Sequence, residues 1–186
     1  MTKPDLLIHA AFKLFYEHGI HAVGINRILQ ETGVAKKTLY HHFASKDALL
    51  EAVLMYRDQV FMDWLTSRMM AAGEGKMAVL ALFDALDDWF HDRVEVLLPF
   101  KGCFFMKANG EFSDHMVNGL CQRHKHNITA FIQANLVGHS AQLSSAELAQ
   151  SISVLKEGAI SQAYVAGDLD AAKRAKAMAV ALLSEK

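Results

Sequence analysis

The sequence predicts an all-α protein of about nine helices, in which a small N-terminal domain of three helices is followed by a larger helical body. The chain has 186 residues and is 52% hydrophobic, which suffices for two such domains. Leu, Ala, Met, Glu and Lys, which favour helices, are abundant, whereas runs of Val, Ile and Thr are absent. The chain has only 2 prolines and no Ser/Gly/Pro tract, so no flexible linker is expected.

Four helices are expected in the first part of the chain. Apolar residues recur at helical spacing over residues 4–18, and a glycine ends this helix. Two short helices follow at 25–32 and 36–43, joined by a turn that contains a second glycine. A serine caps the fourth helix, which begins near Lys46 and extends to about residue 70.

Five helical segments are expected in the rest of the chain. Apolar periodicity predicts helices over about 76–96, 114–136 and 145–166, and a last helix, rich in alanine, over 170–184. Residues 102–112 contain many aromatic side chains and are expected to form a loop or a short helical segment. No segment predicts a strand.

The charged residues support a domain boundary after residue 46. Residues 1–46 contain six Lys/Arg against three Asp/Glu, a net charge of +3, and five of the ten histidines. Residues 47–186 contain the other 13 Lys/Arg against 17 Asp/Glu, a net charge of −4. This asymmetry predicts an anion-binding N-terminal domain and an acidic body, although charge alone does not make the anion a nucleic acid.

The two short helices and their turn form a helix-turn-helix pattern. Such a segment binds DNA by placing its second helix in the major groove, where side chains near the helix start reach bases and phosphates. The apolar residues that would lock the helices together are Ile25, Ile28, Leu29, Val34 and Leu39. The polar residues left facing outward are Lys36, Lys37, Thr38, Tyr40 and one of the pair His41 and His42, since adjacent helical residues point in different directions. The alternative is a structural unit with a solvated basic face.

The segment FKLFYEHGIHAVGINRILQETGVAKKTLYHHFASKDALLEAVL, Phe12 to Leu54, resembles the DNA-binding region of the TetR family of transcriptional repressors. The matching features are the aromatic-Gly block, the Ile-x-x-Ile helix, the Gly-Val turn, the Thr-Leu-Tyr-x-His-Phe core and the Ser-Lys-Asp-x-Leu-Leu start of the fourth helix. The resemblance covers about residues 8–54. It implies a homodimer whose N-terminal helices bind a palindromic DNA operator, and a body with a pocket for a small molecule that releases the DNA.

The resemblance also implies individual DNA contacts. By position these are Lys36, Lys37, Thr38, Tyr40, His42 and Lys46. Relatives often have Thr or Ser at the start of the second helix, where this chain has Gly24 and Ile25. Asn26 and Arg27 are the expected substitutes for the missing hydroxyl.

A ligand cavity is expected among the middle helices. The residues that combine aromatic walls, a flexible thioether and a few polar groups are Phe83, Asp87, Phe90, Phe104, Phe105, Met106, Asn109 and Phe112. Asp87 lies on or beside an apolar stripe, so its carboxylate is either paired in the core or lines the cavity. The alternative for the whole set is an ordinary core.

Two further clusters in the body have less specific interpretations. The side chains Asp84, Asp88, His91, Asp92 and Glu95 lie opposite the apolar stripe of their helix, so a solvated face is favoured over a divalent-cation site. The last two helices have an apolar surface that needs a partner. Since relatives use this pair of helices to dimerise, the expected interface is Leu148, Ile152, Leu155, Ala159, Ile160, Ala163, Ala175, Ala179 and Leu182.

No enzymatic function is indicated. The sequence contains no HExxH, GxSxG, P-loop or CxxC motif, so we expect no catalytic residues, no metal and no cofactor. Cys103 and Cys121 do not make a disulfide framework, and they would need to meet in space to act as a redox switch. The N-terminus lacks a signal-peptide layout and no apolar window could span a bilayer, so we expect a cytoplasmic protein without membrane contact.

Together these features predict a ligand-responsive transcriptional repressor. It would bind a palindromic operator as a homodimer and be released by a small hydrophobic or aromatic molecule. The sequence leaves open a DNA-binding regulator that is switched by cysteine oxidation or by a protein partner instead.

Overall fold

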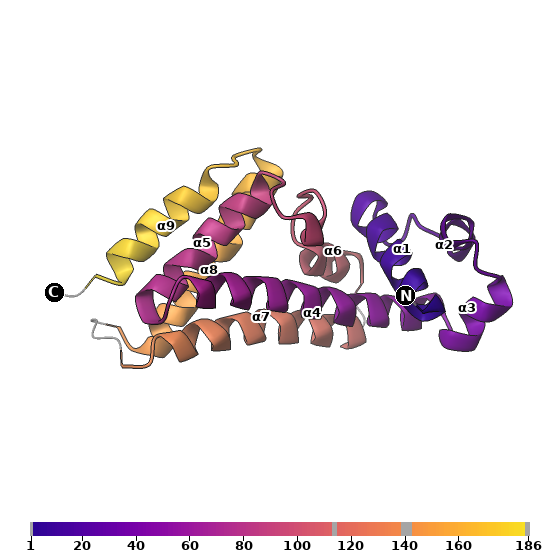
Figure 1. Ribbon diagram of the computed structural model, residues 1–186, viewed down its shortest axis with the longest axis horizontal. Coiled ribbons are helices and arrows are strands. Elements are labelled where there is room, and N and C mark those ends of the chain that lie inside the picture. Colours follow the sequence, from indigo (N-terminus) through magenta and orange to yellow (C-terminus); the bar gives the residue numbers. More distant parts are fainter. Residues whose placement is uncertain (1, 113–114, 139–142, 185–186) are drawn as a thin grey trace. The chain divides into compact units, whose positions relative to one another are not determined.

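The computed structural model describes residues 2–112, 115–138 and 143–184. Within these residues helices are the only regular secondary structure, and they are joined by turns and loops (Figure 1). The predicted all-α fold is therefore confirmed. The elements are α1 (Lys3–His18), α2 (Ile25–Thr32), α3 (Lys36–His42), α4 (Lys46–Ala71), α5 (Gly75–Phe90), the short 3-10 helix η1 (Glu95–Leu97), α6 (Phe104–Glu111), α7 (His115–Asn135), α8 (Ser145–Val165) and α9 (Ala171–Leu182). In this described part of the chain, no helix is both long and apolar enough to cross a membrane.

The chain forms two compact units, and both contain segments distant in sequence. The first comprises Met1–Gln59 and Cys103–His124, and the second comprises Val60–Gly102 and Lys125–Lys186. The first unit is thus larger than the predicted N-terminal domain of residues 1–46, because the start of α4, all of α6 and part of α7 pack with it. The predicted boundary after residue 46 concerns function and stays a prediction.

The first unit is built on α1, which packs against α2 and α3. Its start is fixed by a capping box in which the Thr2 hydroxyl accepts the Asp5 N–H and the Asp5 carboxylate accepts the Thr2 N–H. Apolar side chains from its first four helices are fully buried, among them Leu7, Ala11, Phe15, Ile28, Leu39, Leu49 and Val53. They come from α1, α2, α3 and α4, so the three short helices share one core with the start of the long one.

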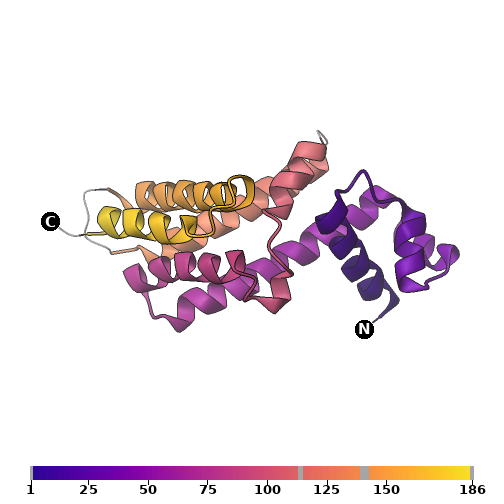
Figure 2. The ribbon, with the colours of Figure 1, turned by 90° about the horizontal axis from the view of Figure 1, so that it is seen from above.

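The second unit packs α9 against α5 and α8, and Figure 2 shows α8 and α9 running side by side. Close approach is possible because the inner face of α9 carries alanines, of which Ala172 and Ala179 are fully buried. The helix α5 ends at Phe90, so its predicted extension to about residue 96 is wrong. Asp92 and Leu98 both adopt positive φ angles, 57° and 63°, which interrupt any regular helix there.

A charged cluster joins α7 to α8 in the second unit. The Lys125 ammonium lies 2.8 Å from both carboxylate oxygens of Glu157, and the Lys156 ammonium donates to the same carboxylate. Lys156 is only 2% exposed, whereas the Glu157 side chain is 32% exposed. Thr129 and Ser153 share a hydrogen bond of 2.8 Å between the same two helices. One carboxylate therefore neutralises a buried ammonium and cross-links two helices.

Candidate functional site

The turn between α2 and α3 has the geometry that a helix-turn-helix requires. Gly33 ends α2 in the left-handed conformation, with φ 65° and ψ 9°, and its N–H donates to the Leu29 carbonyl at 2.9 Å. The Thr32 hydroxyl donates to the Ile28 carbonyl at 2.9 Å and accepts the Val34 N–H at 3.3 Å. Ile28 and Leu39 are fully buried, and α2 and α3 both pack against α1, which holds the two helices in place.

Most of the predicted DNA contacts lie on the outer surface of this motif. Asn26, Arg27, Lys36, Lys37 and His42 are exposed, Tyr40 is 45% exposed, and Thr38 is half-buried. His41 is exposed beside His42, with the two ring centroids 5.1 Å apart and the ring planes at 69°. The exposed set is rich in hydrogen-bond donors, which suits phosphate oxygens and the acceptor groups of bases.

Two of the predicted contacts are already engaged within the first unit. The Arg27 guanidinium lies 2.7 Å from Nε2 of His18. The Lys46 ammonium donates to the Ile20 carbonyl at 2.6 Å and lies 5.7 Å from the centre of the Phe15 ring. Partial burial lowers the pKa of Lys46, against the opposing charges of Glu111 and Asp47. In this conformation Lys46 holds the preceding turn rather than reaching outward.

The start of α2 lacks a side-chain cap, as Gly24 leads us to expect. Gly24 is the N-cap residue, with φ −83° and ψ 159°, and no side-chain hydrogen bond caps the helix. Its carbonyl accepts the Arg27 N–H at 3.1 Å. A Cβ atom added at Gly24 would meet no other atom within 4 Å, so a larger residue fits without strain.

Replacing Gly24 with serine is therefore expected to strengthen both the helix and DNA binding. A serine N-cap stabilises a helix by a few tenths of a kcal/mol more than glycine does and by about 1 kcal/mol more than alanine does. The free energy of unfolding should therefore be highest with Ser, lower with Gly and lowest with Ala. The added hydroxyl should also raise the affinity for DNA by roughly threefold, as one further phosphate contact. Chemical denaturation and fluorescence anisotropy of the three proteins measure both effects. Equal stability and affinity of the serine and alanine variants would contradict this role of the cap.

The predicted ligand residues do not converge on a described pocket. Phe83 and Phe90 are buried in the second unit, whereas Phe104 and Phe105 are buried in the first. The Phe104 ring packs edge-on against Phe12 at 5.3 Å, and the Phe105 ring stacks on His124 at 3.7 Å. These aromatic side chains fill cores.

The remaining predicted ligand residues are polar or exposed. Met106 is 51% exposed and Asn109 is exposed, both on α6. Phe112, also named for this cavity, is half-buried and stacks on His21 in the first unit. The predicted cavity thus stays a prediction for all of these residues.

Asp87 is paired rather than free. Its carboxylate lies 3.4 Å from the Arg93 guanidinium and 3.8 Å from the Lys173 ammonium of α9. Nδ1 of His91 lies 3.6 Å from the same carboxylate. Of the two interpretations drawn from the sequence, pairing is the one that the structure supports.

The acidic face of α5 is also engaged in ion pairs, which the sequence pattern did not reveal. Asp84 lies 2.6 Å from the Lys176 ammonium of α9, and Asp88 pairs with Arg68 of α4. Among the described residues, Asp87, His91 and Asp170 stand close enough to share a metal ion. The cations around Asp87 already neutralise that group, so its chemistry does not favour a metal.

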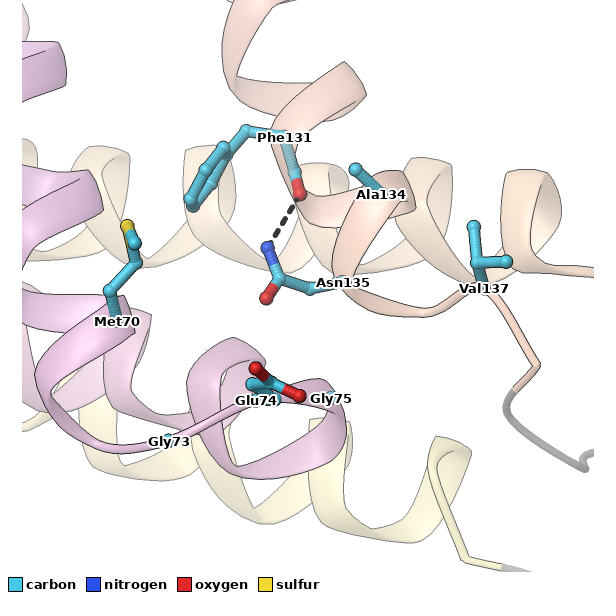
Figure 3. Close-up of a pocket in the computed structure, with 8 residues that line it drawn as sticks. All are labelled: Met70, Gly73, Glu74, Gly75, Phe131, Ala134, Asn135 and Val137. Carbon is cyan, nitrogen blue, oxygen red and sulfur yellow. Dashed lines mark hydrogen bonds between the residues drawn. The ribbon is translucent and has the colours of Figure 1, made fainter.

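A pocket that the sequence did not predict lies in the second unit (Figure 3). It has a volume of about 760 Å³ and is formed by the turn between α4 and α5 and the end of α7. Its lining residues are Met70, Gly73, Glu74, Gly75, Phe131, Ala134, Asn135 and Val137. The Asn135 amide donates to the Phe131 carbonyl at 2.9 Å (Figure 3). The Asn135 side-chain oxygen and the Glu74 carboxylate are acceptors among the groups that line the pocket. The glycines that interrupt the helical pattern were the available sequence signal.

Most of the predicted dimer residues face the interior of their own chain. Leu155 and Leu182 are half-buried, and the other seven (Leu148, Ile152, Ala159, Ile160, Ala163, Ala175 and Ala179) are buried. Three of the nine, Leu155, Ala159 and Ala175, also line a groove on the outer surface of α8 and α9. This groove has a volume of about 390 Å³, and its other lining residues are Val154, Gly158, Gln162, Asp168, Ala171, Arg174 and Met178. Val154 is 71% exposed and Met178 is 54% exposed, which makes this surface unusually apolar.

Both cysteines are buried in the first unit, and neither forms a disulfide. The Cys121 thiol donates to the Phe105 carbonyl at 3.3 Å. The structure therefore shows no disulfide between Cys103 and Cys121.

Comparison with known proteins finds relatives of the N-terminal segment. Residues 7–53 match the model of bacterial regulatory proteins of the tetR family. The chain is 37% identical over 49 residues to the transcriptional regulator UidR of Escherichia coli and 37% identical over 67 residues to the transcriptional repressor KstR2 of Mycolicibacterium smegmatis. These segments cover 26% and 36% of this chain but only 25% and 31% of the two relatives.

The likeness in fold extends over almost the whole chain. The crystal structure of a TetR-family transcriptional regulator from Streptomyces coelicolor superposes with a TM-score of 0.84 at 25% identity, over 96% of this chain and 93% of the other. The family match thus falls on the helix-turn-helix described above, and the shared fold includes the body. Residues 7–53 therefore match the tetR family of bacterial regulatory proteins, and the chain as a whole shares the fold of a TetR-family transcriptional regulator.

Proposed function

We propose that this protein is a cytoplasmic repressor that binds a palindromic DNA operator as a homodimer and is released by a small molecule. The observation that carries DNA binding is the outer surface of α3. Lys36, Lys37, Tyr40 and His42 are exposed there on a helix whose inner residue, Leu39, is fully buried. The surface thus presents donors in a fixed geometry, as groove recognition requires.

Dimerisation through α8 and α9 is supported by the apolar groove on their outer surface. Val154 and Met178 are solvent-exposed in the isolated chain, and Gly158 between them makes room for a close approach. A second copy of the chain would cover these groups. A two-fold dimer also supplies two helix-turn-helix motifs, which matches the symmetry of a palindromic operator.

A small-molecule effector is supported by the pocket beside α7. Its walls are apolar at Met70, Phe131 and Val137, while Glu74 and the free oxygen of Asn135 are acceptors. These groups suit a molecule with an apolar body and a hydrogen-bond donor or a positive charge. To release DNA, the molecule must bind the DNA-free conformation more tightly than the DNA-bound one.

Substitution of Lys36 and Tyr40 tests the DNA-binding function. With an operator selected from a random duplex library, Lys36→Ala and Tyr40→Ala should each lower the affinity by roughly 10- to 100-fold, because each change acts twice in a dimer. Lys36→Ala should also reduce the slope of log affinity against log salt by about two for the dimer. The matched control is Lys76→Ala in the second unit, which should bind like the parent protein. If neither α3 variant differs from this control in an anisotropy titration, the proposal is wrong.

A further inference from the structure

The end of α6 binds the turn between α1 and α2 through hydrogen bonds and ring stacking. Glu111 Oε1 accepts the Ile20 N–H at 3.0 Å, and Glu111 Oε2 accepts the His21 N–H at 2.7 Å. The Glu111 carbonyl oxygen lies 2.8 Å from Nε2 of His21, and the Phe112 ring stacks on the His21 ring at 4.5 Å with the planes 17° apart. All of these residues belong to the first unit.

The turn needs these contacts because two of its backbone N–H groups have no carbonyl of α1 to bind. Gly19, with φ 89°, ends α1, so the next two N–H groups point away from the helix and have no carbonyl of α1 as a partner. One carboxylate accepts both N–H groups, and charge-assisted bonds of this kind are the stronger ones. The Ile20 carbonyl is held in turn by the Lys46 ammonium at 2.6 Å. Both polar groups of the Ile20 backbone are therefore bound by side chains from other helices.

This turn sets the position of the DNA-binding helices. Ile20 and Val23 are fully buried, and the chain reaches Gly24, the start of α2, directly after them. The start of α2 has no side-chain cap of its own to fix it. The contacts that fix the turn therefore fix where α2 begins, and through the buried Ile28 and Leu39 also where α3 lies.

We propose that Glu111 is a positioning residue for operator recognition: its carboxylate, bound to the Ile20 and His21 N–H groups, holds the α1–α2 turn so that α2 and α3 meet DNA in a fixed orientation. The inference rests on the proposed DNA-binding function. It assigns a role in recognition to a residue about 70 positions beyond the helix-turn-helix. Glu111 makes no proposed contact with DNA.

Whether operator affinity rises or falls when Glu111 is replaced distinguishes a positioning role from a purely electrostatic one. A carboxylate in a DNA-binding unit repels phosphates. If charge were the only effect, removing the carboxylate would strengthen DNA binding. Loss of the Glu111 hydrogen bonds to the turn lowers the affinity for the operator, because helices that these bonds no longer fix must be ordered when DNA binds. Binding to non-specific DNA depends on phosphate charge and little on orientation, so the ratio of operator to non-specific affinity is the diagnostic quantity.

The experiment compares Glu111→Gln and Glu111→Asp in the full chain with the control Glu31→Gln. Glu111→Gln keeps the shape but turns one acceptor into a donor, whereas Glu111→Asp keeps the charge but is one methylene too short to hold both N–H groups. Glu31 is an exposed acid on α2, so its replacement removes charge from the same unit without touching the turn. Circular dichroism confirms that each variant is folded.

We expect both Glu111 variants to bind the operator roughly 10-fold more weakly at unchanged non-specific affinity and unchanged salt slope. Hydrogen exchange of the Ile20 and His21 amides should accelerate at least roughly 10-fold, while that of the fully buried Val53 on α4 should not change. Glu31→Gln should bind the operator as tightly as the parent or more tightly. Operator affinities of both Glu111 variants within twofold of the parent would overturn the inference. Failure of DNA binding itself is recognised separately, since the parent protein would then show no dependence on Lys36.

Discussion

Replacing Glu157 with glutamine is expected to lower the free energy of unfolding by about 3 kcal/mol, because the buried ammonium of Lys156 loses its carboxylate. Lys156 is 2% exposed, and the same carboxylate also holds Lys125 at 2.8 Å. Breaking a buried ion pair from one side leaves an uncompensated charge, which costs more than the pair contributes. Chemical denaturation of the parent and variant measures the difference.

A second substitution shows whether the buried charge is the cause. In the double variant Lys156→Met with Glu157→Gln, the ammonium is absent, so most of the lost stability should return. Lys125→Ala should cost less, since the Lys125 side chain is 30% exposed and is screened by water. A Glu157→Gln protein within about 0.5 kcal/mol of the parent would contradict the role of the carboxylate.

The stability lost on replacing Glu157 with glutamine should also depend on pH. Burial raises the pKa of Glu157, but the charges of Lys156 and then Lys125 outweigh burial and hold the pKa below its ordinary value. A carboxyl whose pKa is lower in the folded chain stabilises the fold above the unfolded pKa, roughly 4.3 for glutamate. This stabilisation is lost as the pH falls through the folded value. The difference between parent and Glu157→Gln should therefore be full at neutral pH and shrink in acid.

Replacing Gly158 with arginine is expected to weaken dimerisation by at least roughly 100-fold, equivalent to about 2.7 kcal/mol. Glycine inside a helix costs about 0.5–1 kcal/mol relative to alanine, and a Cβ atom at Gly158 would meet nothing within 4 Å of its own chain. No contact within the described residues of the single chain thus requires a glycine at this position. A second copy packed against the groove would use it, and a long charged side chain would then prevent the close approach.

The matched control is Gly158→Ala. The added methyl should raise the stability of the single chain by about 0.5–1 kcal/mol and leave the dimer largely intact. Analytical ultracentrifugation across a range of concentrations gives the dissociation constants. A dimer of Gly158→Arg with the parent's dissociation constant would show that the α8–α9 groove is not the interface.

The sequence predicted the helix-turn-helix well because its determinants are local. Helical spacing marks the buried Ile28 and Leu39, and Gly33 marks the turn, so the exposed side of α3 follows by elimination. The end of α5 was not predictable in the same way. Leu98 carries no turn signal, and Asp92, although aspartate tolerates a positive φ angle, lies within the range over which apolar periodicity predicted the helix.

The partners of a side chain were harder to predict than its helix. Apolar periodicity on α8 and α9 identifies a face that needs burial, but it does not say whether the same chain or a second copy covers it. Ile152 and Ala179 are covered by their own chain, whereas Val154 is not. Glu111 was missed because its partner Ile20 is 91 positions away.

The grip of Glu111 on the α1–α2 turn also limits how the N-terminal helices can be transplanted. Every predicted DNA contact lies before residue 59, which invites the construction of chimeric regulators that exchange only this segment. The compact unit, however, also includes Cys103–His124, and Glu111 supplies the acceptor for two N–H groups of the exchanged part. From the proposed role of Glu111, we expect a chimera to keep operator specificity only when it carries α6 along with the helix-turn-helix. DNA recognition would then depend on two separate segments of the chain.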